Sequence, residues 1–399
     1  MLPEGLPHRS EAELRKDCAQ RWTVLMVEDP DEASAGATGR WHSIMKRGSL
    51  CKRAASGVVV PLSEAEATGA TEGQPSPAGQ AGPGPEHEHE WTVSWLDEIV
   101  LSSSINDGGR GMELSTLTWH RGRLLTCDDR TGVMYEVIHG ALLPRYILSD
   151  GDGEVRNGDG NDAGRGFKCE WAAVRHGKLY VGSVGKEWIA PSGALLHRRA
   201  QWVKLVDGDA VRHVNWTDTY EALRHAAGCP YPGYLWHEAA LWDDSKERWL
   251  FMPRRASETE PYDEVLDETR GASLLLWASG TTQAALPGKF GRRAARRGAA
   301  GDGARAPQIT VGHVRGERDP RRGFSAIKLL PGEPGTIVAV RTQELRGKVS
   351  SYLTVLREDG TVLMRDTLIS NASKFEGLEV ASSHHTRANS FASPHQDQP

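Results

Sequence analysis

The sequence predicts an all-β fold, a five-bladed β-propeller with low-complexity surface insertions. The main observation is a repeat in which an acidic or hydroxyl residue opens a short apolar strand, a polar turn follows, and a second apolar strand comes next. The chain also supplies many turn residues, with 44 glycines and 21 prolines. Its 13 tryptophans suit aromatic packing between sheets. Repeats of this kind favour blades arranged around an axis.

Four full copies of the repeat can be read along the chain. Their first strands lie at residues 112–119, 170–174, 237–242 and 324–330. A last short copy at 374–380 has no second strand after it. In a propeller this strand can come from the N-terminus, where residues 22–27 read Trp-Thr-Val-Leu-Met-Val. Such closure would remove the sheet edges between the first and last blades.

One large domain accounts for most of the 399 residues. We predict a polar N-terminal extension at 1–20, a single propeller domain at 21–380 and a disordered tail at 381–399. Two insertions, at about 64–90 and 280–306, are rich in Ala and Gly and hold too little apolar surface to offset the entropy of ordering. We therefore expect solvated surface loops, including the Arg-rich part of the second insertion.

Charge and apolar runs argue against several classes of protein. The formal net charge of −5 argues against a nucleic-acid binder. No stretch approaches the ~20 apolar residues of a membrane span. Residues 1–20 contain no apolar run of signal-peptide length, so the residues alone leave the compartment unassigned. The sequence also leaves the oligomeric state open, and a homodimer is possible.

The cysteines show no recognisable pairing pattern. Cys18, Cys51, Cys127, Cys169 and Cys229 form no Cys-x-x-Cys pair, and one is left over in any full pairing. We interpret them as core or free thiols rather than a disulfide framework or a zinc site.

Two motifs begin like metal sites and then depart from the pattern. His-Glu at 237–238 starts like the zinc-protease helix, but Leu241 stands where the second histidine must lie. Asp-Gly-Asp at 150–152 starts like a calcium loop, but Val155 replaces the glycine of the sharp turn. We interpret the second motif as a surface turn.

Seven short motifs follow one another between residues 109 and 377, within a likeness that runs from about residue 22 to residue 379. They are Gly-Arg-Gly-Met-Glu-Leu-Ser at 109–115, Cys-Asp-Asp-Arg-Thr-Gly at 127–132, Gly-Ser-Val-Gly-Lys-Glu-Trp at 182–188, Gly-Tyr-Leu-Trp-His-Glu at 233–238, Arg-Trp-Leu-Phe-Met-Pro-Arg-Arg-Ala-Ser at 248–257, Gly-Phe-Ser at 323–325 and Phe-Glu-Gly at 375–377. In this order they resemble the soluble calcium-activated nucleotidase family, which includes salivary apyrases of blood-feeding arthropods. That family usually works in the secretory pathway or outside the cell.

The resemblance implies a five-bladed propeller with one calcium ion on its axis. The implied activity is hydrolysis of nucleoside di- and triphosphates, of the UDP, GDP, ADP and ATP class, with release of phosphate. The implied calcium ligands, one per repeat, are Ser115, Glu170, Glu238, Ser325 and Glu376. These residues also open the inner strands of the repeat read from the sequence. Their carboxylate and hydroxyl oxygens, with water, suit a cation that takes about six to eight oxygen ligands.

The resemblance also indicates residues for phosphate and base. Arg254 matches a family position implicated in phosphate or nucleotide handling, and Lys186 and Arg130 are candidate helpers. Trp188 is a candidate to stack on a base. The alternative for each is an ordinary structural role, as a solvated arginine at a blade edge or a core tryptophan.

The segment after the first apolar strand holds the main departure from the family. Asp29 and Asp31 are candidates to orient a water molecule or accept its proton. Ala33 stands where the family has a third aspartate, and Pro30 stiffens the loop. A catalytically weakened propeller that binds calcium and nucleotide therefore stays open. So does another calcium-dependent propeller hydrolase, such as a lactonase-like enzyme.

Overall fold

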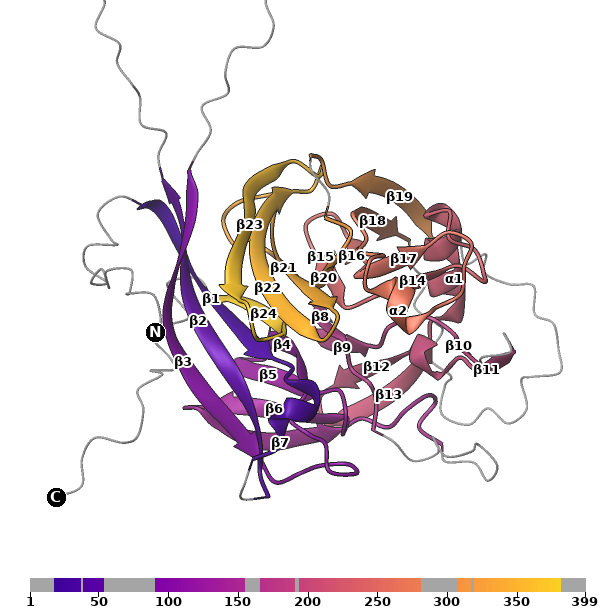
Figure 1. Ribbon diagram of the computed structural model, residues 1–399, viewed down its shortest axis with the longest axis horizontal. Coiled ribbons are helices and arrows are strands. Elements are labelled where there is room, and N and C mark those ends of the chain that lie inside the picture. The colour runs from indigo at the N-terminus through magenta and orange to yellow at the C-terminus, as the bar shows by residue number, and fades with distance from the viewer. Residues whose placement is uncertain are drawn as a thin grey trace, which may run out of the picture.

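The computed structural model describes residues 18–36, 39–53, 90–154, 166–190, 194–280, 307–316 and 319–381. In this part of the chain, five four-stranded antiparallel sheets surround a common centre (Figure 1). The predicted five-bladed propeller is confirmed. The predicted insertions at about 64–90 and 280–306 and the tail at 381–399 lie almost wholly outside the described residues.

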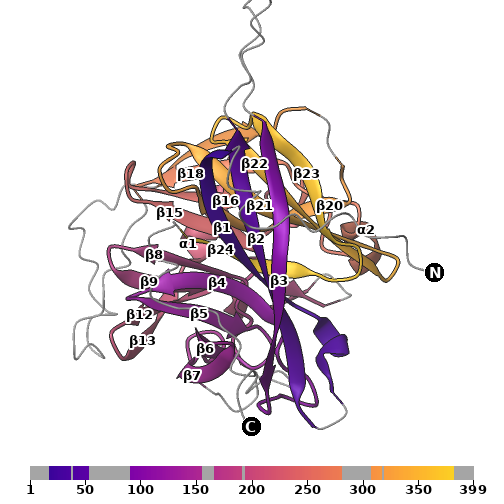
Figure 2. The same cartoon turned by 90° about the vertical axis from the view of Figure 1, so that its left-hand side faces the viewer.

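The first blade joins the two ends of the described chain. Its strands, in spatial order, are β24 (Phe375–Ala381), β1 (Cys18–Glu28), β2 (Trp41–Arg53) and β3 (Trp91–Ser103). β1 pairs antiparallel with β24, with Val24 opposite Val380. Figure 2 views this blade, where β1, β2 and β3 lie side by side. The predicted closure by residues 22–27 is confirmed, and pairing on both sides leaves β1 without an open edge.

The other four blades follow in chain order. The second contains β4 (Leu114–His120), β5 (Arg123–Asp128), β6 (Val133–Ile138) and β7 (Ala141–Ile147). The third contains β8 (Trp171–Arg175), β9 (Lys178–Gly182), β12 (Trp202–Asp207) and β13 (Ala210–Asn215). The fourth contains β15 (Ala239–Asp243), β16 (Arg248–Met252), β18 (Leu274–Ser279) and β19 (Gln308–His313). The fifth contains β20 (Arg322–Leu329), β21 (Thr336–Leu345), β22 (Lys348–Arg357) and β23 (Val362–Ser370).

Short elements fill the connections between strands. They are the pair β10 (Trp188–Ile189) and β11 (Leu195–His197), the pair β14 (Tyr234–Trp236) and β17 (Arg255–Ser257), the helices α1 (Thr217–Ala226) and α2 (Glu264–Asp267), and the 3-10 turns η1 (Asp31–Ser34) and η3 (Arg199–Gln201). Within the described ranges, no helix has the length and apolar character needed to cross a membrane.

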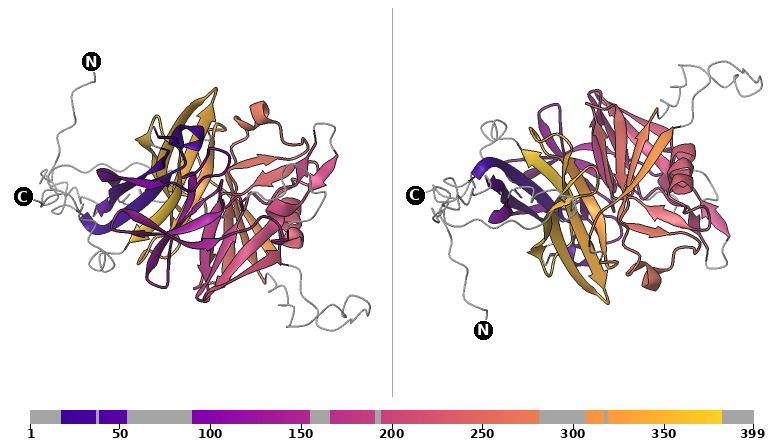
Figure 3. Two further views of the ribbon diagram at one scale, coloured as in Figure 1. Left: turned by 90° about the horizontal axis from the view of Figure 1, so that it is seen from below. Right: turned by 90° about the horizontal axis from the view of Figure 1, so that it is seen from above.

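The innermost strands form a closed ring. β24 contacts β4, and the contacts continue through β8, β15 and β20 back to β24. The ring is tight: a Cβ added to Gly377 would lie 2.4 Å from Val27 Cγ2 and 2.7 Å from the Thr116 carbonyl carbon. Figure 3 shows the first blade on the opposite side of the molecule from the third and fourth blades. Residues at the start of each inner strand therefore converge on the axis.

Aromatic side chains pack between the third and fourth blades, as the tryptophan content predicts. The rings of Trp216 and Trp249 lie 5.2 Å apart and edge to face. Trp171 packs against both. These contacts belong to one buried cluster shared by the two sheets, so they fix the blades against each other.

Two disulfides overturn the interpretation as core or free thiols for four of the five cysteines. Cys18 bonds to Cys51, and Cys127 bonds to Cys169, whereas Cys229 is a buried free thiol. The partners lie 33 and 42 residues apart. Antiparallel pairing of β1 with β2 brings the first pair together, and the contact between the second and third blades brings the second pair together. Only tertiary structure creates these proximities, so sequence spacing could not reveal them.

The two motifs set aside in the sequence have ordinary structural roles. Residues 150–152 form a turn in which Gly153 N donates to Asp150 O at 2.9 Å and the Lys204 ammonium donates to Gly151 O. The predicted turn is thus present, with Gly151 buried and Asp150 and Asp152 partly exposed. Residues 237–238 lie between β14 and β15 rather than on a helix, so the zinc-protease geometry is absent there.

Candidate metal and phosphate site

Three glutamates from three blades meet on the axis. Glu170 immediately precedes β8, Glu238 immediately precedes β15, and Glu376 is the second residue of β24. All three are buried, and one carboxylate oxygen of each lies within 4.8 Å of the others. We call these residues the axial cluster. The ring of inner strands therefore gathers three of the predicted metal ligands.

The two predicted serine ligands differ in their surroundings. Ser115, on β4, lines the same small axial pocket as the three glutamates. Its buried Oγ has no hydrogen-bond partner among the described residues. Ser325, on β20, is fully buried, and its Oγ lies 2.6 Å from Thr342 Oγ1. An unpartnered hydroxyl beside three carboxylates fits a hard cation such as calcium.

The axial carboxylates need positive charge beside them, part of which Arg254 and Lys374 supply. Burial raises the pKa of Glu170 to about 7, against the lowering effect of Lys168, and repulsion from Glu238 adds to the rise. Burial likewise raises the pKa of Glu376 well above its usual range, with Lys374 opposing and Glu238 reinforcing the rise. Buried carboxylates this close are difficult to ionise together unless positive charge lies among them.

Arg254 reaches directly into the axial cluster. Its Nη1 donates to both Glu238 oxygens at 2.7 Å and to Glu376 Oε1 at 2.9 Å. Its Nη2 lies 2.8 Å from Glu344 Oε2. The structure thus brings Arg254 together with two of the predicted metal ligands.

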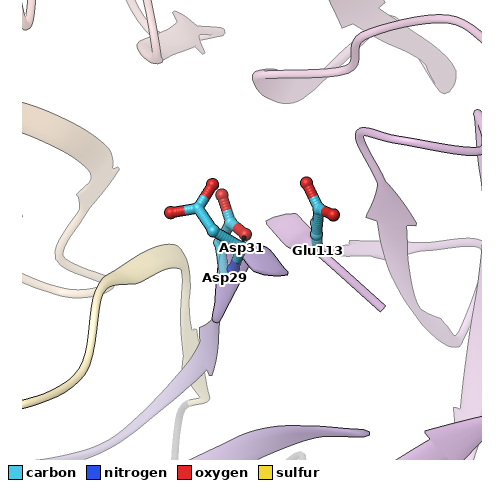
Figure 4. Close-up of side chains that lie close together, drawn as sticks. All are labelled: Asp29, Asp31 and Glu113. Carbon is cyan, nitrogen blue, oxygen red and sulfur yellow. Dashed lines mark hydrogen bonds between the residues drawn. The ribbon is translucent and has the colours of Figure 1, made fainter. Parts of the chain in front are cut away.

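A second group of carboxylates lies beside the first. Asp29 and Asp31 follow β1, whereas Glu113 comes from the segment before β4, and Figure 4 shows its side chain beside the two aspartates, on a separate stretch of chain and pointing upward in the view as theirs do. One oxygen of each lies within 4.8 Å of the others. We call these residues the lateral cluster. It contains both aspartates predicted to act on water.

Lys374 connects the two clusters. Its Nζ lies 2.7 Å from Asp29 Oδ2, 2.8 Å from Asp31 Oδ2 and 3.5 Å from Glu376 Oε1. Burial acts to raise the pKa of Asp29, but Lys374 overcomes this and holds the pKa below its usual range. Asp29 is therefore an ionised carboxylate that can accept hydrogen bonds.

The far side of the lateral cluster is held by Arg110. Its guanidinium donates to Glu113 at 2.8 and 2.6 Å in a bidentate pair. Ala33, where the family has a third aspartate, is exposed on the 3-10 turn η1.

An aromatic enclosure surrounds Lys186. Its Nζ lies 4.4 Å from the ring centre of Tyr262, 4.5 Å from that of Trp188 and 5.3 Å from that of Trp236. Burial lowers the pKa of Lys186 to about 8. Trp236 Nε1 donates to Glu238 Oε1 at 2.8 Å, so the enclosure adjoins the axial cluster.

Arg130 lies differently from the other predicted site residues. Its Nη2 pairs with Asp107 Oδ2 at 3.2 Å, and its backbone N–H donates to Asp128 Oδ1 at 3.1 Å. These contacts lie outside both carboxylate clusters.

Several site residues were not assigned from the sequence. Lys374, Glu113 and Trp236 lie within repeats or motifs already read from the sequence, at 374–380, 109–115 and 233–238, so adjacency to a predicted ligand was the available signal. Glu344 and Tyr262 lie outside every motif. No sequence signal indicates them, because only the folded chain brings them to the site.

The fold and the site define a five-bladed propeller whose axis holds buried carboxylates from separate blades, with arginine and lysine beside them. The family model described as Apyrase matches residues 84–298 and 305–381. The chain therefore belongs to the apyrase family, which agrees with the resemblance found in its motifs.

Relatives from several animals are similar to this chain. Soluble calcium-activated nucleotidase 1 of Rattus norvegicus is 40% identical over 291 residues, which is 72% of this chain and 64% of the relative. Apyrase of Cimex lectularius is 35% identical over 292 residues, 72% of this chain and 71% of the relative. Apyrase apy-1 of Caenorhabditis elegans is 31% identical over 384 residues, 95% of this chain and 90% of the relative. The match thus spans a little under two thirds of the rat protein.

Proposed function

We propose that this protein is a calcium-dependent hydrolase of nucleoside di- and triphosphates, of the UDP, GDP, ADP and ATP class, that releases phosphate. The observation that carries the proposal is the axial cluster, three buried glutamates from three blades with oxygens within 4.8 Å. The names of the similar proteins support both the calcium dependence and the nucleotide hydrolysis, since they include a calcium-activated nucleotidase and apyrases.

Calcium would be held by the axial cluster together with Ser115 and Ser325. Carboxylate and hydroxyl oxygens form the hard ligand set that calcium prefers. When bound, calcium supplies positive charge for phosphate oxygens and lowers the pKa of coordinated water.

The cationic side chains of the site bind the phosphates. Arg254 has the planar guanidinium that matches phosphate oxygens, and it lies at the axial cluster. Lys186 is a second cation. Within the described part of the chain its Nζ donates to the Glu187 backbone carbonyl at 3.4 Å and to no carboxylate. Trp188, on the wall of that enclosure, offers a ring face for a base. Together these groups offset negative charge that grows on the leaving phosphate.

The lateral cluster acts on water. Asp29 is ionised beside Lys374 and can accept a hydrogen bond that orients the attacking water molecule. Burial and the charge of Asp29 raise the pKa of Asp31, which makes Asp31 the better acceptor of the proton. Asp31 and Glu113 add two more oxygens at the same place. The three carboxylates are present without a contribution from position 33, which supports turnover despite Ala33.

The experiment is phosphate release from UDP, GDP, ADP and ATP, each with calcium, with magnesium and with a chelator. We expect release with calcium, little with magnesium and none with chelator. Calcium binding without phosphate release from any nucleotide would instead favour the catalytically weakened binding propeller. Release that persists in chelator would contradict the proposal.

A further inference from the structure

The two disulfides lie in different surroundings. Cys18–Cys51 joins β1 to β2, and Cys18 begins β1 at the end away from Asp29. Cys127–Cys169 joins β5 of the second blade to the segment just before β8 of the third. Cys169 is followed directly by Glu170 of the axial cluster.

An ion-pair bridge runs parallel to the second disulfide. The Lys168 ammonium contacts Asp129, two residues after Cys127, and lies 2.8 Å from Glu170 Oε1. The second and third blades are thus joined twice beside Glu170, once by a covalent bond and once by charge.

Glu170 is held differently from Glu376. It precedes β8, and its backbone N–H donates to Gly182 O at 2.8 Å. Glu376, by contrast, lies within β24, which pairs with β1 along its length. Cys127 and Cys169 are fully buried and pack with Phe167 in one apolar cluster. The bond therefore anchors the short segment that carries Glu170 to a rigid core.

We propose that the Cys127–Cys169 disulfide is a positioning element of the cation site, which holds Lys168 and Glu170 so that Glu170 meets Glu238 and Glu376. The inference rests on the proposed calcium site. Under this proposal, calcium affinity depends on the Cys127–Cys169 disulfide although neither cysteine is a calcium ligand. The Cys18–Cys51 disulfide, by contrast, contributes only to the stability of the first blade.

The chain offers its own matched control. The two bonds close loops of 33 and 42 residues, so the loop-entropy account gives them nearly equal effects on stability. The test compares Cys127→Ser/Cys169→Ser with Cys18→Ser/Cys51→Ser in the full chain, by calorimetric titration with calcium alone. Cys127→Ala/Cys169→Ala is made in parallel, because serine hydroxyls would be buried in an apolar cluster.

We expect the Cys127/Cys169 pair to weaken calcium binding about tenfold or more, as loss of a group supporting a metal ligand does. The Cys18/Cys51 pair should bind calcium as wild type does while melting at a lower temperature. The inference would be overturned if both Cys127/Cys169 variants bound calcium as tightly as wild type. It would also be overturned if removing either disulfide lowered calcium affinity by the same factor. Wild-type protein that binds no calcium would overturn the proposed function and this inference with it.

A double-mutant cycle separates positioning from general weakening of the fold. Glu170→Gln removes the charge of the ligand that the disulfide is proposed to position, and it keeps Glu238 and Glu376 so that the weaker calcium binding can still be measured by titration at higher calcium concentration. If the disulfide works by positioning Glu170, its removal should change calcium affinity far less in the Glu170→Gln background than in wild type. Equal fold-changes in the two backgrounds would contradict the proposal.

Discussion

The axial and lateral clusters contain the same kind of side chain in different settings. Each has three carboxylates with oxygens within 4.8 Å. The axial glutamates come from three blades and are all buried, with side chains at most 3% exposed. The lateral cluster comes from two segments, and the side chain of Asp31 is 49% exposed. The first setting suits a cation stripped of water, and the second suits contact with water and substrate.

The basic side chains beside the two clusters also differ in where they lie. Arg254 binds the axial glutamates from within the buried centre. Lys374 lies between the clusters and contacts both. The comparison suggests that the axial cluster holds the metal and the lateral cluster carries out proton transfer. Substitutions in the two clusters should therefore fail in different ways.

The largest effect is expected for Glu238→Gln. It removes one charge from the axial cluster with little change in volume, so calcium affinity should fall steeply and nucleotide turnover should fall about a thousandfold. Turnover and calorimetric calcium binding measure this. Glu379→Gln is the control, because Glu379 is a buried glutamate of β24 that pairs with Lys328 outside both clusters. Activity retained in Glu238→Gln would defeat the assignment of the axial site.

Asp29→Asn should separate the clusters. Removing a carboxylate that orients the attacking water should lower kcat about a hundredfold, whereas calcium binding without nucleotide should stay close to that of wild type. Asp97→Asn, an exposed aspartate on β3 paired with Arg47, serves as the control. Loss of calcium affinity equal to that of Glu238→Gln would show that the two clusters act as one metal site.

The pKa of Lys186 leads to a prediction for how kcat/KM depends on pH. Burial lowers the pKa of Lys186 to about 8, so the side chain is charged below that pH and neutral above it. If its charge binds phosphate, kcat/KM should fall about tenfold for each pH unit above the pKa. Lys186→Arg should keep activity at pH 9, because arginine stays protonated. An identical pH profile in that variant would exclude Lys186 as the titrating group.

The smallest effect is expected for Ala33→Asp, which restores the family aspartate. Ala33 is exposed, and the lateral cluster is complete without it, so kcat should change by no more than about threefold, within the range of a typical surface substitution. Steady-state kinetics against UDP measure the change. A rise of about a hundredfold would instead show that the wild-type site is catalytically weakened.

Sequence patterns predict the parts of this molecule that repeat. Each blade contributes an inner strand opened by an oxygen-bearing residue, so the repeat predicts that such residues meet on the axis, and the family resemblance implies that Glu170, Glu238 and Glu376 are among them. The N-terminal strand could be assigned to the last copy because that copy lacks a partner. Lys374 and Glu113 could not be assigned, since their roles depend on how loops from different blades meet. The disulfides were interpreted wrongly for the same reason.

Crystals grown with calcium and a non-hydrolysable nucleoside diphosphate analogue give the most direct test of the central claim, through the anomalous signal of calcium. The account predicts a peak bounded by Glu170, Glu238 and Glu376, with Ser115 among its ligands. A single peak at Asp29, Asp31 and Glu113, with none on the axis, would contradict it.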